Sequence, residues 1–407
     1  MRMRRFFKLF AAALLILLCI PQVMAAPSVI SESAVLMDAD TGQILYNKDM
    51  HAKRYPASIT KIATVICGLE NGSLADKIVM TDEAVFSVSR DSSHIALDVG
   101  EEITLEQACY AALMMSANDA CNGIAEACAG TIPAFVDMMN EMAVRAGAVG
   151  THFANANGLR DSNHYTTAFD MASICRYAIK NKDFRKIFGT YKYTMPPNNK
   201  QPEQRNFINQ HSMISDPAFL YDGIVGGKAG WTTDAQFTLV TAAEREGKTL
   251  IAVVMKSPRN NDKYTDTKAL LDYGFESFDS VAITSSDLPR REGYRLSAPI
   301  NLSVKKGTTR EDLVISTTME NGEDFVVVSY SDGEEIGKFP CSVAIDVSVP
   351  TSAAEEPEKG FSIWSVLGVL GLILLSLIAL FLLLVLAIII RKKIYRARRR
   401  RRRRRRK

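Results

Sequence analysis

Acidic residues are missing from both ends of this 407-residue chain. Residues 1–26 hold four lysines and arginines, residues 391–407 hold fourteen, and neither segment contains an aspartate or glutamate. Between them, residues 27–390 carry 31 cations against 45 acids, so this middle part has a net charge of −14 although the whole chain has +4. An acidic middle part disfavours a nucleic-acid-binding domain, and we expect no nucleic-acid partner.

Histidine and cysteine are scarce, and neither shows the spacing of a metal site. The five histidines form no metal-spaced pair, which disfavours a zinc peptidase, and we expect no metal and no other cofactor. Cys19 lies in the N-terminal apolar run; the other six cysteines are even in number, which allows disulfides, but none forms a C-x-x-C pair. We favour buried free thiols, because five of the six lie in apolar helical stretches and a chain this long needs no disulfides to complete its core.

Residues 1–26 have the layout of a secretory signal peptide. Arg4 and Arg5 precede an apolar run over residues 9–20, and the small residues Ala25 and Ala26 provide a cleavage site. The alternative is an uncut anchor, but the run is short for a membrane span, which needs about 20 apolar residues. We therefore expect an exported protein.

Residues 361–390 form a second apolar run, thirty residues long and without a charge. As a helix it would extend about 45 Å, enough to span a bilayer with room to tilt, and its length disfavours a buried core helix. The polybasic tail 391–407 follows directly, and such cations favour the cytoplasmic side, where they attract anionic lipids. The sequence thus predicts a single-pass cell-membrane protein with residues 27–360 on the extracytoplasmic side and a cytoplasmic C-terminus.

The exported part divides into a larger segment 27–275 and a smaller segment 276–350. Periodicity in the larger segment predicts β-hairpins over 33–49 and 236–256 and helices over 59–69, 105–115, 133–146, 168–180 and 262–274. An antiparallel sheet built from both ends of this segment, with helices inserted between, gives a mixed α/β (α+β) fold. The smaller segment has short β-like runs and no helical pattern, which predicts an all-β domain, and residues 351–360 form a polar linker.

Ser58 and Lys61 lie three residues apart at the start of the first expected helix, so their side chains share one face. A serine hydroxyl becomes a strong nucleophile when a base removes its proton. An amine one turn away can be that base if burial or a nearby cation lowers its pKa. By itself this pattern is weak, because a capping serine beside a solvated lysine produces it too.

Two further motifs follow in chain order: Ser116-Ala117-Asn118 after a helix end, and Lys228-Ala229-Gly230 in a glycine-rich turn at a strand start. S-x-x-K, then S-[DA]-N, then K-T-G is the signature of serine acyltransferases that include penicillin-binding proteins and class A β-lactamases. Over residues 30–275 the chain resembles the low-molecular-mass penicillin-binding proteins, the D-alanyl-D-alanine carboxypeptidases. Three stretches carry the resemblance: YPASITK, SANDACNGIAE and THFANANGL.

The resemblance implies a DD-peptidase/β-lactamase-like fold and a serine-type carboxypeptidase that β-lactams acylate. Such an enzyme removes the terminal D-alanine from peptidoglycan pentapeptide stems through an acyl-enzyme, in cell wall biogenesis. Ser58 would be the nucleophile and Lys61 its base; Ser116 would pass a proton to the leaving D-alanine, and Asn118 would bind the acyl-side amide. The implied substrate-binding residues are Lys228, for the terminal carboxylate, with Gly230, Trp231 and Thr232. The backbone N–H groups of Ser58 and Trp231 would form the oxyanion hole.

The chain departs from the family pattern at three positions. Ala229 stands where the third motif usually has threonine, so one hydroxyl donor to the carboxylate is missing, which costs about 1.5 to 3 kcal/mol. Thr232 or Thr233 is a candidate to compensate. Ala156 and Asn157 replace the usual proline and histidine, and we assign no function to that loop. No glutamate is placed as in class A β-lactamases, which disfavours a β-lactamase.

Two other functions compete with the enzyme. Ala229 motivates a penicillin-binding regulatory homologue with impaired turnover. The basic tail motivates a membrane organiser whose function would depend on residues 391–407 and not on Ser58.

Overall fold

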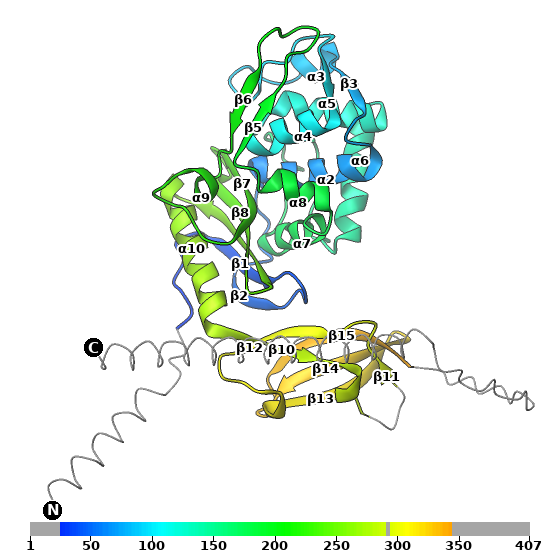
Figure 1. The fold of residues 1–407 in the computed structure, drawn as a ribbon, viewed down its shortest axis with the longest axis vertical. Coiled ribbons are helices and arrows are strands. Elements are labelled where there is room, and N and C mark those ends of the chain that lie inside the picture. Colours follow the sequence, from blue (N-terminus) through cyan, green and yellow to red (C-terminus); the bar gives the residue numbers. More distant parts are fainter. Residues whose placement is uncertain (1–24, 290–293, 344–407) are drawn as a thin grey trace, which may run out of the picture. The chain divides into compact units, whose positions relative to one another are not determined.

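The computed structural model describes residues 25–289 and 294–343 (Figure 1). The predicted linker, membrane span and basic tail lie outside these residues, as does the signal peptide except for Ala25 and Ala26. Within the described residues, no helix combines the length and apolar character needed to cross a bilayer.

A five-stranded antiparallel sheet forms the centre of the larger segment. It contains β1 (Ser33–Asp38), β2 (Ile44–Lys48), β7 (Ile224–Thr232), β8 (Gln236–Arg245) and β9 (Lys248–Ser257) in the order β2-β1-β9-β8-β7. Both predicted hairpins are confirmed, β1 with β2 and β8 with β9. Strands from the two ends of the segment meet where β1 pairs with β9, as predicted. Strand β7 lies at the edge of the sheet, so one side of its backbone is free to meet a ligand.

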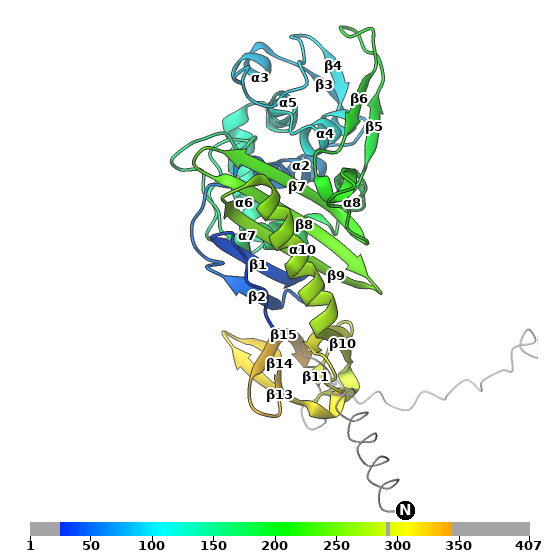
Figure 2. The ribbon, with the colours of Figure 1, turned by 90° about the vertical axis from the view of Figure 1, so that its left-hand side faces the viewer.

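Helices cover both faces of this sheet (Figure 2). The long helix α10 (Asn260–Ser277) packs on one face, against β8 and β9, and α7 (Ala168–Ala178) packs against the other. The same side also holds α2 (Lys61–Asn71), α4 (Leu105–Met114), α5 (Asn118–Ala129), α6 (Ile132–Arg145) and α8 (Lys182–Phe188), of which α8 contacts β7 directly. The core on this side joins apolar residues of the sheet with those of the helices.

The predicted helices are confirmed with small shifts of their ends. The capping box of Thr104 and Gln107 is present at the start of α4, where the two side chains satisfy each other's backbone N–H groups. Several elements were not predicted from the sequence: α5, α8, α3 (Asp82–Phe86), α9 (Ser212–Ser215), β3 (Lys77–Val79), β4 (Glu102–Thr104), β5 (Lys192–Met195) and β6 (Arg205–Ile208). Helix α5 was missed because its many small residues blur the apolar period: eight of its residues are buried.

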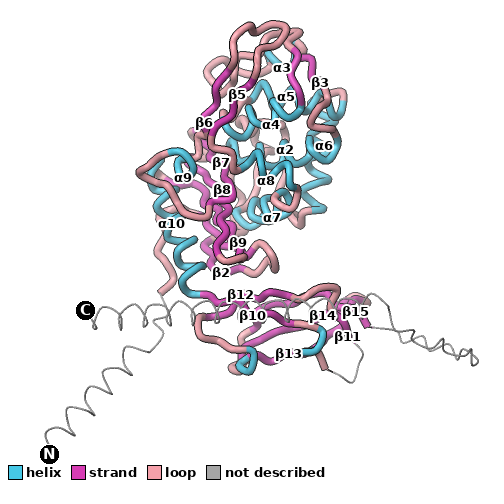
Figure 3. The backbone as a smooth tube through the Cα atoms, in the orientation of Figure 1, coloured by secondary structure: helices cyan, strands magenta, loops and turns pink. Residues whose placement is uncertain are grey.

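The smaller segment is built mainly of strands, with two short 3-10 helices at Ser285–Asp287 and Arg310–Asp312 (Figure 3). Strands β10 (Phe278–Ile283) and β12 (Ile300–Lys305) pair with each other. A four-stranded sheet follows the order β11-β15-β14-β13, with β11 (Tyr294–Arg295), β13 (Leu313–Glu320), β14 (Glu323–Tyr330) and β15 (Glu335–Val343). All described residues belong to one compact unit, so the division at residue 275 stays a prediction.

All six cysteines between residues 67 and 341 are free thiols, as predicted. Four are buried and two are half-buried, and burial raises the pKa of each buried thiol.

Candidate active site

Ser58 and Lys61 meet at the junction between a 3-10 turn and helix α2. Ser58 lies in the turn Ala57–Thr60 and Lys61 is the first residue of α2. The Nζ atom of Lys61 lies 3.0 Å from the Oγ atom of Ser58. Ala57 holds a φ of 52°, a left-handed conformation that a residue with a side chain rarely adopts. The predicted pair is therefore within hydrogen-bond distance on one helix face.

The Lys61 side chain is fully buried, which determines its acid–base behaviour. Burial disfavours the charged ammonium and lowers the pKa of Lys61 to about 8, against a smaller opposing effect of Cys121 and Asp119. Nζ also donates a hydrogen bond of 2.6 Å to the main-chain carbonyl of Asn157. At neutral pH the amine is thus oriented by two oxygen atoms and partly deprotonated.

The loop that contains Asn157 supports the serine turn, although we assigned it no function from the sequence. Gly158 has a φ of 87°, and a Cβ atom there would lie 2.0 Å from the carbonyl oxygen of Ala57. The Asn157 amide group donates to Asn122 Oδ1 on α5 at 3.2 Å. Asn157 contributes its main-chain carbonyl to the site, and a sequence motif does not show what a main-chain atom contacts. In the sequence, the signal for this loop was the resemblance of the stretch THFANANGL, which includes Gly158, to the family pattern.

The second motif forms the turn between α4 and α5. Ser116 has a φ of 60° and is buried, and its hydroxyl makes no hydrogen bond within the described residues. Asn118 begins α5; its Nδ2 atom donates to Ser92 Oγ at 3.0 Å, whereas its Oδ1 atom is buried without a partner in the described part of the chain. A buried acceptor without a donor is costly. This oxygen is therefore suited to accept a hydrogen bond from a bound N–H group.

The third motif lies within the edge strand β7, whose bounds Ile224–Thr232 include the whole glycine-rich stretch, so the predicted turn at a strand start is wrong. Lys228 is buried, and burial together with repulsion from Lys61 lowers its pKa well below the ordinary range. At Gly230, a Cβ atom would lie 2.8 Å from the backbone nitrogen of Ser58, so only glycine allows β7 to come this close to the nucleophile. The structure thus brings the first and third motifs into contact.

Trp231 and Thr232 continue β7 beyond the nucleophile. Trp231 is exposed, and the Thr232 hydroxyl accepts a hydrogen bond of 3.1 Å from the backbone N–H of Ala235. Thr232 lies four residues from Lys228, about 13 Å along an extended strand. Lys228 and Thr232 therefore occupy well-separated positions along β7.

Lys263 on α10 is a second buried cation near the third motif, and the sequence analysis missed it. Its Nζ atom lies 2.5 Å from Asn260 Oδ1 and 5.0 Å from the centre of the Phe237 ring. Its charge acts on Lys228, and burial lowers the pKa of Lys263 to about 8. Residues 263, 267, 270 and 274 are buried and have the spacing of one face of α10. A lysine on this face was the feature of the sequence that could have identified Lys263.

A sequence model of the D-alanyl-D-alanine carboxypeptidases matches residues 21–259 of the chain. The chain belongs to this family. It is thus a serine-type carboxypeptidase, a hydrolase among the penicillin-binding proteins, as predicted.

Curated relatives and solved structures agree with the assignment. The D-alanyl-D-alanine carboxypeptidase DacF of Bacillus subtilis is 28% identical over 342 residues, which cover 78% of this chain and 86% of the relative. The D-alanyl-D-alanine carboxypeptidase of Streptomyces sp. K15 is 29% identical over 61% of this chain and 88% of its own. Penicillin-binding protein 5 of Haemophilus influenzae matches with a TM-score of 0.68 and 25% identity, over 79% of this chain and 98% of its own. This similarity confirms the predicted mixed α/β DD-peptidase fold.

Proposed function

We propose that this carboxypeptidase removes the terminal D-alanine from peptidoglycan pentapeptide stems through an acyl-enzyme on Ser58, in cell wall biogenesis. The observation that carries the proposal is the 3.0 Å contact between Ser58 Oγ and the buried amine of Lys61. An amine with a pKa of about 8 is neutral in about one molecule in ten at pH 7, about 300 times more often than an ordinary lysine. Lys61 can therefore accept the serine proton without another base.

Acylation begins when Ser58 Oγ attacks the carbonyl carbon between the two D-alanines and Lys61 takes its proton. The backbone N–H groups of Ser58 and Trp231 stabilise the resulting oxyanion, a contribution of about 2.7 to 4 kcal/mol per donor. The close approach of Gly230 to the Ser58 nitrogen supports this role for β7. Lys61 then returns the proton through the Ser116 hydroxyl to the leaving D-alanine nitrogen.

Asn118 holds the acyl side of the substrate. Its buried Oδ1 atom accepts a hydrogen bond from the N–H of the penultimate D-alanine, which gives this oxygen the partner it otherwise lacks. Its Nδ2 atom is already fixed by Ser92, so the side chain is oriented before the substrate binds.

The terminal carboxylate distinguishes a chain end from a peptide interior, and two buried cations are available to recognise it. Lys228 and Lys263 each lose solvation on burial, and a bound carboxylate compensates both. Lys263 thereby supplies a donor in place of the threonine hydroxyl that Ala229 lacks. Its approach from α10, outside the third motif, explains how turnover can survive this substitution.

The membrane part of the proposal rests on the sequence. Residues 361–390 anchor the enzyme in the cell membrane, the catalytic part faces the extracytoplasmic side, and the cytoplasmic tail binds anionic lipids. Cell fractionation and protease accessibility of a C-terminal epitope test this topology. If deleting residues 391–407 abolished function while Ser58→Ala did not, the chain would be a membrane organiser instead.

Labelling with a fluorescent penicillin, followed by measurement of D-alanine release from a synthetic stem peptide, tests the enzymatic mechanism. We expect labelling of the wild type and none of Ser58→Ala, with matching loss of D-alanine release. Absence of wild-type labelling would refute the acyl-enzyme. Ala229 also supports a second candidate, a penicillin-binding regulatory homologue. Rapid labelling with negligible D-alanine release would favour that function.

A further inference from the structure

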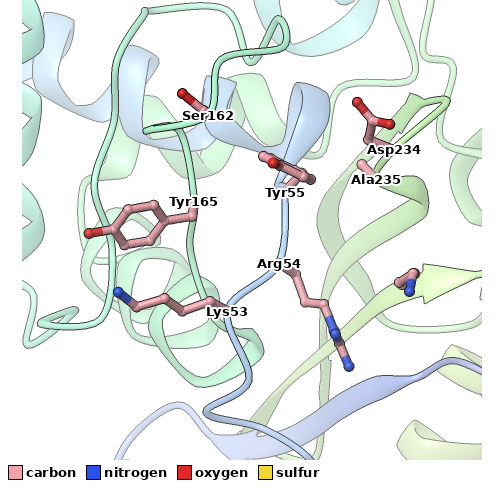
Figure 4. Close-up of a pocket in the computed structure, with 8 residues that line it drawn as sticks. Lys53, Arg54, Tyr55, Ser162, Tyr165, Asp234 and Ala235 are labelled. Atoms are coloured by element: carbon pink, nitrogen blue, oxygen red, sulfur yellow. The ribbon is translucent and has the colours of Figure 1, made fainter.

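A cavity of about 340 Å³ lies beside the nucleophile turn and has no part in the mechanism above. Its walls come from the segment before Ser58, the loop after Arg160, the turn after β7, and β9. The lining residues are Lys53, Arg54, Tyr55, Ser162, Tyr165, Asp234, Ala235 and Lys256. Figure 4 shows Lys53 and Tyr165 on one side of the Arg54–Tyr55 segment and Asp234 and Ala235 on the other. The volume is large enough for one amino-acid side chain.

The cavity lies on the upstream side of the scissile bond. The terminal carboxylate is bound at Lys228, and the reacting carbonyl lies at Ser58, beside Gly230. A peptide that extends along the edge of β7 in this direction reaches Thr232 and then Asp234. A small hollow of about 10 Å³ lies between the two regions, since its lining includes Ala57 and Thr232 together with Tyr55 and Asp234 of the cavity. The residue that precedes D-Ala-D-Ala therefore arrives at this cavity.

The cavity carries an excess of positive charge. Arg54 and Lys256 both pair with Glu32, at 3.2 Å and 2.8 Å, so two cations share one carboxylate. Asp234 is already paired with Arg160.

Lys53 has no carboxylate within ion-pair distance in the described part of the chain. Its Nζ atom is held 4.1 Å from the centre of the Tyr165 ring. Contact with the ring restrains the lysine and leaves its ammonium hydrogens available to an anion. Lys53 is thus the free cation of the cavity, positioned by an aromatic wall.

We infer that this cavity is a specificity subsite for a free carboxylate on the stem residue preceding D-Ala-D-Ala, and that Lys53 is its recognition residue. The inference rests on the proposed function, because the direction of the peptide follows from the roles of Lys228 and Ser58. Arg54 and Lys256 add to the positive potential, while Tyr55 and Tyr165 contact the aliphatic part of the side chain.

Three synthetic peptides of the form acetyl-Xaa-D-Ala-D-Ala test the subsite, with Xaa as L-glutamate, L-glutamine or L-lysine. In the wild type we expect kcat/KM for the glutamate peptide to exceed that for the glutamine peptide by roughly 3- to 10-fold, as for a partly exposed ion pair. The lysine peptide should be slowest. In Lys53→Gln the ratio of kcat/KM for the glutamate peptide to kcat/KM for the glutamine peptide should fall close to one. In Lys53→Glu the lysine peptide should become a better substrate than the glutamate peptide.

Lys180→Gln is the matched control, because this exposed lysine follows α7 and lies outside the cavity lining. Lys180→Gln should leave the relative kcat/KM values of the three peptides unchanged. Acylation by a small penicillin, which has no preceding stem residue, should proceed at the wild-type rate in every variant and shows that they are folded.

Different results would overturn the subsite and the carboxypeptidase mechanism on which it rests. Release of D-alanine at equal rates from all three peptides, or ratios unaffected by Lys53→Gln, would overturn the subsite and leave the carboxypeptidase mechanism intact. Absence of both acylation and D-alanine release in the wild type would overturn the mechanism and the subsite with it.

Discussion

Acylation of Ser58 by a β-lactam should accelerate with pH and level off above about pH 8. Lys61 acts as a base only when neutral, and burial lowers its pKa to about 8. At that pKa about 1% of the amine is neutral at pH 6, about 10% at pH 7 and about half at pH 8. Below pH 7 the acylation rate at saturating β-lactam should therefore rise about tenfold per pH unit.

Stopped-flow fluorescence with a labelled penicillin, from pH 5.5 to 10, measures this profile. Lys61→Arg is the control, because a guanidinium stays protonated throughout the range and cannot accept the serine proton. This variant should lose acylation at every pH. A wild-type rate that is flat from pH 5.5 to 8, or a midpoint near the ordinary lysine value of about 10.5, would refute a buried neutral amine as the base.

At low β-lactam concentration the same experiment should give a bell-shaped profile. The second-order rate constant also includes binding of the carboxylate, and binding needs the cation of Lys263, whose pKa burial lowers to about 8. As pH rises above 8 that charge is lost and binding weakens. At saturation the bound carboxylate raises the pKa of Lys263, so the falling limb should disappear. A saturating rate that falls with the same midpoint would contradict this assignment.

Four substitutions test the remaining interactions. Lys263→Gln should lower kcat/KM about 10- to 100-fold for a peptide with a free C-terminal carboxylate, and leave the value for the C-terminal amide unchanged. Ala229→Thr should raise D-alanine release about tenfold, with a larger gain in the Lys263→Gln background; no gain in either would contradict our account of the missing hydroxyl. Gly158→Ala should lower the free energy of unfolding by about 2 kcal/mol or more and slow acylation, because the new Cβ atom would meet the carbonyl of Ala57. An unchanged urea midpoint of unfolding would exclude this steric effect. Lys61→Met should raise the free energy of unfolding by up to about 3 kcal/mol at pH 7, because Lys61 is fully charged in the unfolded chain and pays a desolvation penalty in the folded one. Above pH 10.5 this gain should vanish, because Lys61 is then neutral in both the folded and the unfolded chain.

The elements that the sequence predicted are those with a strong local pattern. The hairpins β1–β2 and β8–β9 combine apolar, β-like runs with clear turns, and α4 carries a capping box. Helix α5 was missed because alanine, glycine and cysteine bury its face without large side chains. A short strand such as β3 depends on a pairing partner beyond a long loop, β4, which a local pattern does not contain.

For the site, the sequence supplied the reactive residues and not their environment. The spacing of Ser58 and Lys61 indicated a nucleophile and a base. The lowered pKa of Lys61, on which its proposed role as a base rests, comes from its complete burial, and that burial depends on helices and loops from across the domain. The contributions of Asn157 and Lys263 were not predicted, because one acts through a main-chain carbonyl and the other lies on a helix outside the three motifs.

By itself, the sequence determined the chemistry: the three motifs, the acidic middle part between two basic ends, and the missing hydroxyl at Ala229. Only the tertiary structure decided how these parts act on one another. It brings Gly230 against the Ser58 nitrogen and puts Lys263 where its charge acts on Lys228. It also holds Lys53 against the ring of Tyr165, in the wall of the cavity that we propose as a subsite. The physical reason is that burial and distance set pKa values and electrostatic interactions, and both are properties of the folded chain.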